Sequence, residues 1–193
     1  MPILRNRTTA VPVENMDIAI KLSKLIDETW CTNKDYYAAV AIVYNPENKK
    51  LILLERKEFP GDPWSGHIAL PGGRKEESDK NSYFTSLREL VEEIKSINPR
   101  EIIHLGGMKT YISRGVYQVV PHIYLIKNIP ELIWSREEIE RAEWIDIDEL
   151  KEIECPPEKT PRCFTTNKFK KIIWGLTGRI LGDLLSVLKN DEA

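Results

Sequence analysis

The chain has 193 residues, of which 41% are hydrophobic and 30% are charged, so it can bury a sizeable core and is not disordered throughout. This length is typical of a single domain. The formal net charge of −2 argues against nucleic acid binding through phosphate contacts, because such binding needs a basic surface.

Residues 1–35 are predicted to form an N-terminal arm followed by a helix. The first ten residues lack the continuous apolar stretch of a secretory signal. No run in the chain approaches the ~18 apolar residues that cross a bilayer. Residues 16–30 carry apolar side chains at helical spacing, which predicts the helix. We therefore expect a cytoplasmic protein without a membrane partner.

Several segments have the composition of β-strands and are separated by turn residues. A turn signal at residues 46–49 joins the first two strands into a hairpin, and Pro71 with two glycines stops the third. Residues 113–115 form the turn between the fourth and fifth strands. The predicted strands are 36–45, 50–57, 66–72, 102–113, 117–128 and 142–147.

Two further helices are predicted, at residues 82–94 and 170–190. Three prolines mark the segment before the last helix as irregular. The last helix carries a stripe of apolar residues, Ile173, Leu176, Ile180, Leu184 and Leu188. Glycines in this helix lower its helix propensity, which indicates close packing against another element. That element could be a second subunit, as in a homodimer. These glycines are Gly175, Gly178 and Gly182.

Strands and helices alternate without a strict βαβ rhythm, which favours an α/β fold of the α+β type. We expect a central mixed β-sheet with helices on both faces, formed by residues 36–193. Cys31, Cys155 and Cys163 show no CxxC spacing and are odd in number. They are expected to be free thiols in a reducing compartment, and a bridge between Cys155 and Cys163 is the alternative.

The helix at residues 82–94 gathers three glutamates at one end. At 100° per residue, its apolar stripe of Leu87, Leu90, Val91 and Ile94 is predicted to be buried. Glu89, Glu92 and Glu93 fall together on the opposite side. One interpretation is an ordinary amphipathic helix with its acids in water.

Electrostatics favours a second interpretation of these glutamates. Like charges three and four residues apart repel, and carboxylates in a last turn oppose the helix dipole. Arg88 and Lys95 lie only toward the edge of the acidic sector. A divalent cation would make this arrangement favourable, because carboxylates leave open positions for water and phosphate oxygens. The preceding Gly72-Gly73 allows close backbone approach to a ligand, and a carbonyl there could join the metal shell.

Gly73, Asp79 and the sequence Arg88-Glu-Leu-Val-Glu-Glu93 resemble the signature of the Nudix hydrolases. Eight residues separate Asp79 from Arg88, compared with seven in the general pattern. That expansion is similar to the coenzyme A pyrophosphatase subgroup, as are "LPGG", "SLRE" and the C-terminal "IWGLTGRIL". The resemblance covers about residues 38–185 and implies a Nudix-like α/β/α sandwich.

The resemblance implies hydrolysis of a nucleoside diphosphate linked to another moiety, with Mg²⁺ or Mn²⁺ as cofactor. The metal would be held by Glu89, Glu92, Glu93 and the Gly73 carbonyl. One of these glutamates, or Glu138 or Glu140, would take a proton from water. Arg88 is counted with the catalytic residues and is expected to anchor the loop through Asp79 or Glu89.

Five residues are candidates for substrate binding: Gly72, Arg74, Trp64, His67 and Glu138. Trp64 could stack on a base or pack its loop, and His67 could contact substrate or be an ordinary packed strand residue. His104 and His122 lack ligand spacing, and Trp174 is expected in the core or an interface. The substrate could be coenzyme A or a derivative, ADP-ribose or a dinucleotide. Two hypotheses without catalysis remain open: a nucleotide-binding regulatory module, and a structural protein with an acidic helix.

Overall fold

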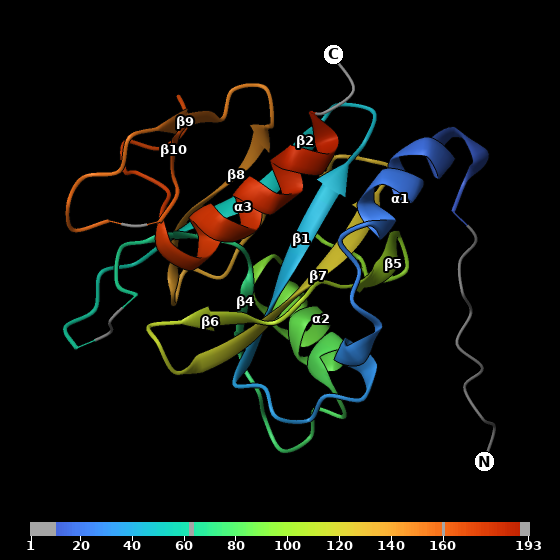
Figure 1. Cartoon of the computed structure of the whole chain (residues 1–193), viewed down its shortest axis with the longest axis horizontal. Coiled ribbons are helices and arrows are strands. Elements are labelled where there is room, and N and C mark those ends of the chain that lie inside the picture. Colours follow the sequence, from blue (N-terminus) through green and yellow to red (C-terminus); the bar gives the residue numbers. More distant parts are fainter. Residues whose placement is uncertain (1–10, 62–63, 160, 190–193) are drawn as a thin grey trace.

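The structure, a computed structural model, describes residues 11–61, 64–159 and 161–189. The predicted arm falls largely on residues 1–10, which lie outside the described residues. The predicted fold class is confirmed, because a mixed β-sheet lies between layers of helices (Figure 1).

The sheet is built around β1 (Ala38–Asn45), most of whose residues are buried. β2 (Lys50–Arg56) pairs with β1 antiparallel and confirms the predicted hairpin. On the other side of β1, β7 (Tyr117–Ile126) runs parallel to it. A parallel pair needs a long crossover connection, which here includes the glutamate-bearing helix α2 (Ser82–Glu93).

The order of the main strands is β3-β2-β1-β7-β5, with β4 paired to β1, β6 to β7 and β8 to β2. The bounds of the other strands in this sheet are β3 (Ile68–Ala69), β4 (Gly72–Arg74), β5 (Ile102–Gly107), β6 (Tyr111–Ser113) and β8 (Ile139–Asp146). A separate two-stranded sheet consists of β9 (Lys151–Ile153) and β10 (Cys163–Thr165).

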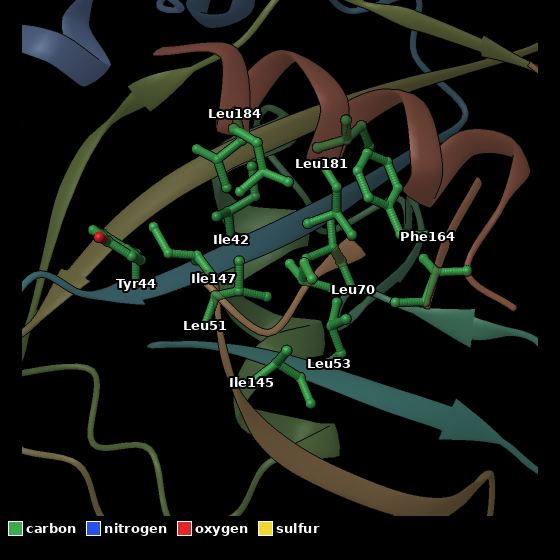
Figure 2. Close-up of a cluster of buried hydrophobic side chains, with 14 of the residues drawn as sticks. Ile42, Tyr44, Leu51, Leu53, Leu70, Ile145, Ile147, Phe164, Leu181 and Leu184 are labelled. Atoms are coloured by element: carbon green, nitrogen blue, oxygen red, sulfur yellow. The ribbon is translucent and has the colours of Figure 1, made fainter. Parts of the chain in front are cut away.

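Each face of the sheet is covered by its own apolar cluster. On one face, α1 (Met16–Ser23) and α3 (Gly175–Leu188) pack against strands β1 and β2. Figure 2 shows this cluster, with Leu181 and Leu184 of α3 pointing toward Ile42 of β1 and Leu53 of β2. On the opposite face, Leu90 of α2 lies in a second cluster. The two clusters make the three layers of the sandwich.

Two predicted helices are shorter in the structure than their apolar periodicity indicated. The segment predicted at 16–30 divides into α1 and a 3₁₀ turn, Glu28–Cys31, capped by the Asp27 side chain. The last helix begins at Gly175 because Ile173 pairs with Phe164 through two backbone hydrogen bonds of 2.8 and 2.9 Å. Ile173 is therefore buried, but it does not belong to the helix.

Two predicted strands also differ from their expected bounds. The run at 102–113 divides into β5 and β6, with residues 108–110 between them and a bulge between His104 and Gly106. The strand expected at 142–147 is longer and begins at Ile139, because it pairs with β2 along nearly its whole length. In both cases the partner strand sets the bounds, and a single-strand pattern does not contain that information.

The glycines of α3 pack closely against the same chain. A Cβ on Gly178 would lie 2.1 Å from the Arg162 carbonyl oxygen, and one on Gly182 would lie 2.1 Å from the Arg162 guanidinium. This contact accounts for two glycines without a second subunit. No helix in the described ranges is both long enough and apolar enough to pass through a bilayer.

The expectation of three free thiols is wrong for two of the cysteines. Cys155 and Cys163 form a disulfide, with their Cα atoms 5.3 Å apart. The segment between β9 and β10 folds back and brings the two thiols together. Cys31 is free and exposed. The cysteines therefore give no support to a reducing compartment.

Reducing the Cys155–Cys163 disulfide is expected to lower the free energy of unfolding by about 2 kcal/mol, because an eight-residue separation closes a small loop in the unfolded chain. Denaturant unfolding with and without a dithiol reductant measures the effect. A Cys155→Ser/Cys163→Ser variant should match the reduced wild type, and Cys31→Ser is the control. An unfolding midpoint that does not respond to the reductant would contradict this pairing.

Candidate active site

The Gly72-Gly73 pair lies in a strand and not in a turn, which corrects the expected end of the third strand. Pro71 separates β3 from β4, and its carbonyl oxygen accepts a 2.7 Å hydrogen bond from the Ala41 N–H. Gly72 has φ +153°, and a Cβ there would lie 2.4 Å from the Ala39 carbonyl oxygen. Only glycine fits such close antiparallel contact between β4 and β1.

Helix α2 begins next to β4 and carries the glutamates along its side. Asn81 caps it, since its side-chain oxygen accepts hydrogen bonds from the N–H groups of Tyr83 and Phe84. The buried face of the helix contains small polar residues, Ser82, Thr85 and Ser86, as well as Leu90. Those small side chains let the helix approach the sheet closely.

Glu93 is buried, which corrects the expectation that all three glutamates lie away from the core. Its side chain is 6% exposed, and Oε2 accepts a 2.8 Å hydrogen bond from the Gly72 N–H. Burial raises the pKa of Glu93 to about 8; the nearby Glu89 charge acts in the same direction, and Gly72 and Arg56 oppose it. An anionic Glu93 therefore needs additional positive charge nearby.

Glu89 lies directly against Gly73. A Cβ on Gly73 would be 2.4 Å from the Glu89 carboxylate carbon, so the absence of a side chain there makes room for this group. Burial is the largest cause of the raised pKa of Glu89, and the hydrogen bond from Arg88 partly offsets it. Two adjacent glycines thus each contact one of two glutamates, Glu89 and Glu93.

Arg88 is a hub of ion pairs that holds the loop between β4 and α2. Its guanidinium contacts Asp79 at 3.0 Å, Glu89 at 2.9 Å and Glu92 at 3.2 Å, and it donates to the Arg74 carbonyl oxygen at 2.9 Å. Burial alone would raise the pKa of Asp79, but hydrogen bonds from Arg88, the Glu76 N–H and Thr85 lower it below its ordinary value. Arg88 contacts more of the acidic sector than its place in the sequence indicated.

A cleft of about 1030 Å³ opens over β4. It brings together most of the predicted site: Trp64, His67, Gly72, Gly73, Arg74, Glu89 and Glu138. Glu92, whose side chain is 56% exposed, does not line the cleft, and neither do Arg88 and Glu93. Glu140 is described in the structure, but it does not line this cleft.

The cleft also contains residues that the sequence did not single out. Arg56, at the end of β2, lies 3.9 Å from Glu138. Trp174, which was expected in the core or an interface, lines the cleft and contacts the His67 ring at a centroid distance of 4.9 Å. The other additions are Tyr37, Arg114, Tyr117 and Arg179. Only the fold brings these residues together, because they come from distant segments.

His104 and His122 lie outside the cleft, behind α2. Their rings are joined by a 2.9 Å hydrogen bond, and His122 also contacts the Ser82 hydroxyl at 2.9 Å. Burial lowers the pKa of His104 to about 4 and that of His122 to about 3. Both are therefore neutral packing residues of the second apolar face at ordinary pH.

The donors around Gly73 suit a divalent cation in their chemistry. Glu89 and Glu93 supply carboxylate oxygens, and burial raises the pKa of both groups. Mg²⁺ and Mn²⁺ prefer carboxylate oxygens as ligands and would favour the charged form of both side chains. Across the described ranges, no three acidic, histidine or cysteine side chains are gathered as they would be around an ion. The carboxylates of Glu89 and Glu92 both accept hydrogen bonds from Arg88, at 2.9 and 3.2 Å.

Comparisons with known proteins agree with this geometry. The family model of the NUDIX domain matches residues 35–162. The uncharacterized Nudix hydrolase NudL of Pectobacterium atrosepticum is 26% identical over 141 residues, which cover 69% of this chain and 72% of that protein. Nudix hydrolase 22, chloroplastic, of Arabidopsis thaliana is 24% identical over 148 residues, covering 67% of this chain and 47% of that protein.

A solved structure shows the same fold over most of the chain. The MutT/nudix family protein from Enterococcus faecalis aligns with a TM-score of 0.51 and 18% identity, covering 93% of this chain and 70% of that one. The chain spans less than half the length of three of the curated relatives that it matches. Since the NUDIX match covers well over half of its residues, the chain belongs to the Nudix family.

Proposed function

We propose that the chain is a metal-dependent hydrolase that cleaves the diphosphate bond of a nucleoside diphosphate linked to another moiety. One observation carries the proposal: the Glu89 and Glu93 carboxylates contact the Gly72-Gly73 backbone beside a cleft of about 1030 Å³. Ligand clefts of ~300–1,000 Å³ accommodate molecules of nucleotide size. The two carboxylates thus lie beside a space that is large enough for a diphosphate and the groups attached to it.

Water attacks one phosphorus atom of the P–O–P bridge, and the bond to the bridging oxygen breaks. Glu89 and Glu138 line the cleft, and one of them accepts the proton of the attacking water. A divalent cation held by Glu89, Glu92, Glu93 and the Gly73 carbonyl would supply positive charge for the phosphoryl oxygens and acidify a bound water. Glu92 would have to give up its 3.2 Å hydrogen bond from Arg88 to join this set.

The remaining candidates bind substrate or position the acids. Arg88 acts through the glutamates, because its guanidinium holds Glu89 and Asp79 together. Arg74 and the backbone of Gly72 bind the diphosphate, and Trp64, His67 and Glu138 contact the groups attached to it.

Coenzyme A or a derivative is the substrate that we propose first. Support comes from the eight-residue spacing between Asp79 and Arg88 and from the "LPGG" and "SLRE" sequences, which are similar to the coenzyme A pyrophosphatase subgroup. ADP-ribose and dinucleotides are the alternatives, because Gly73 and the glutamates contact only the diphosphate that all of these share.

Hydrolysis of a panel of diphosphates with Mg²⁺ or Mn²⁺, with products identified by mass, tests the proposal. The panel contains coenzyme A, ADP-ribose and a dinucleotide. The matched control variant is Glu131→Gln, because Glu131 is exposed and does not line the cleft. Coenzyme A cleaved to 4′-phosphopantetheine and 3′,5′-ADP would support the first substrate. If no compound releases a phosphorylated product, the hydrolase proposal fails and a nucleotide-binding module is favoured.

We also propose that residues 36–193 form the hydrolase domain, preceded by residues 1–35. A cytoplasmic location and a homodimer remain predictions of the sequence. Size-exclusion chromatography with light scattering tests the homodimer.

A further inference from the structure

Five side chains form a continuous row along one wall of the cleft, in the order Arg74, Tyr37, Tyr117, Trp64 and Arg114. The Arg74 guanidinium lies 5.4 Å from the Tyr37 ring centroid, and Tyr37 stacks on Tyr117 at 4.3 Å with an angle of 34° between the rings. Tyr117 meets Trp64 edge-on at 5.6 Å, and the Arg114 guanidinium lies 5.9 Å from the Trp64 ring. We call these five residues the aromatic row.

Strand register explains why the row begins beside Gly73. Ala38 pairs with Arg74 of β4 on one side of β1 and with Val119 of β7 on the other. Tyr37 precedes Ala38, and Tyr117 lies two residues before Val119, so the two rings meet at the end of the sheet. Arg74 directly follows Gly73. The row therefore leads from the diphosphate site to the tip of the β6–β7 hairpin (Figure 1).

Arg114 occupies the tip of that hairpin in an unusual backbone conformation. Its φ is +49°, and Gly115 follows with φ +77°. Arg114 and Gly115 are the central residues of a β-turn that is closed by a 3.2 Å hydrogen bond from the Val116 N–H to the Ser113 carbonyl oxygen. Turns with positive φ at both central residues favour asparagine or aspartate before glycine, because other residues are strained at positive φ. Strained residues concentrate at ligand sites, where the side chain has a use that outweighs the backbone preference. An arginine placed here and aimed along Trp64 fits that pattern.

The charges of the cleft divide into two regions. Among its described lining residues, the acidic ones are Glu89 and Glu138, and both lie near Glu93 at the β4 end. Arg56 faces Glu138 at that same end. Arg114 lies at the other end of the row, and Arg179 joins it in the lining and donates to the Ile112 carbonyl oxygen of β6. The near end of the cleft thus holds Glu89 and Glu138 together with Arg56 and Arg74, whereas the described lining at the far end is basic and aromatic.

We propose that the aromatic row binds a nucleobase whose ribose carries its own phosphate, in addition to the diphosphate that is cleaved, and that Arg114 determines this preference. This proposal rests on the proposed function. Aromatic faces bind bases by stacking without regard to base identity. A guanidinium binds phosphate through paired hydrogen bonds that a lysine ammonium does not reproduce. The row offers both surfaces side by side, and it begins at Arg74, the residue after Gly73.

Substrate pairs that differ by one phosphate test the role of Arg114. Hydrolysis of coenzyme A is compared with that of 3′-dephospho-coenzyme A, and NADP⁺ with NAD⁺, for the wild type and Arg114→Asn. We expect the wild type to prefer the phosphorylated member of at least one pair. Arg114→Asn should reduce that preference in kcat/KM at least about tenfold, mainly through KM, while the unphosphorylated member changes less than about twofold.

Two further variants separate recognition from folding and from charge. Asparagine tolerates positive φ, so Arg114→Asn should unfold at the same temperature as the wild type or higher. Arg114→Lys keeps the charge and should restore only part of the preference. Lys49→Asn is the matched control, because Lys49 also has φ +51° and lies in the exposed β1–β2 turn outside the cleft. It should leave both substrates unchanged.

A binding measurement makes the test independent of turnover. Calorimetry compares adenosine 3′,5′-bisphosphate and adenosine 2′,5′-bisphosphate with AMP, and Arg114→Asn should weaken at least one bisphosphate about tenfold while leaving AMP unchanged. Equal binding of all three by the wild type, or equal weakening of all three by the variant, would overturn the proposal for Arg114. Hydrolysis of the panel together with such a result would leave the proposed function intact. If no compound is hydrolysed but the bisphosphates still bind selectively, the proposed hydrolase function fails and the proposal for the aromatic row is supported.

Discussion

Glu93→Gln is expected to lower kcat for diphosphate hydrolysis by at least ~10²-fold and, at the same time, to stabilise the metal-free protein at pH 8 and above. Activity falls because a neutral amide replaces the carboxylate that contacts Gly72. Folding improves because the glutamine oxygen can still accept the hydrogen bond from the Gly72 N–H, while the burial of a charge disappears.

The pH dependence has a definite sign. Burial raises the pKa of Glu93 to about 8 in the folded chain, from an ordinary value of 4.5. Between these values the folded chain keeps a proton that the unfolded chain has lost, so stability is full below about pH 4.5 and declines as the pH rises toward 8. With a chelator present, the Glu93 contribution to wild-type stability should fall by roughly 4 kcal/mol over this interval, and Glu93→Gln should lack that fall.

Denaturant unfolding in a chelator between pH 5 and pH 9 measures this difference, and steady-state kinetics with Mg²⁺ or Mn²⁺ measures kcat. Glu92→Gln should also lower kcat by at least ~10²-fold. It should leave stability nearly unchanged, because 56% of the Glu92 side chain is exposed. Glu131→Gln should change neither quantity. Near-native turnover in both Glu92→Gln and Glu93→Gln would show that the active site lies elsewhere.

Arg88→Ala is expected to have the largest effect on stability, lowering the free energy of unfolding by about 3–5 kcal/mol. Asp79 is the reason, because only 4% of its side chain is exposed and the variant leaves its charge buried without the guanidinium. The loss corresponds to a fall in Tm of roughly 6–20 °C for a domain of this size. Turnover should also fall, because Glu89 loses the partner that orients it.

Matched variants distinguish this explanation from a general loss of positive charge. Lys127→Ala removes a lysine paired with Glu14, and both side chains are more than 60% exposed, so its effect should stay within about 1 kcal/mol. Arg88→Lys keeps the charge but cannot reach Asp79, Glu89 and the Arg74 carbonyl together, so its stability should be intermediate. Equal stability of Arg88→Ala and Lys127→Ala would contradict the role of the hub.

Local pattern is sufficient to predict α2, the β1–β2 hairpin and the sandwich, because periodicity and turn residues are properties of short segments. Local pattern does not predict the burial of Glu93, because the buried face of α2 includes residues outside its apolar stripe. Ser82 and Ser86 are small enough to be buried beside Leu90, and they rotate the buried face toward Glu93. Helix position alone does not carry that information.

The aromatic row could not be predicted for a different reason. Tyr37 and Tyr117 are 80 positions apart in the sequence, and each looks like an ordinary residue at the start of a strand. They stack because β1 and β7 pair in parallel with one specific register. The sequence allows a Cys155–Cys163 pair but does not favour it, since the return of the chain between β9 and β10 decides their distance.

The parallel pairing of β1 with β7 has a consequence for how the chain folds. It joins residues about 80 positions apart, so a long stretch of chain must collapse before these strands can meet. During synthesis, α2 leaves the ribosome before β7 exists, and its buried serines and Glu93 have no complete sheet to pack on. Pairing with β7 is therefore expected to be a late and slow step, and catalytic competence should arise together with it.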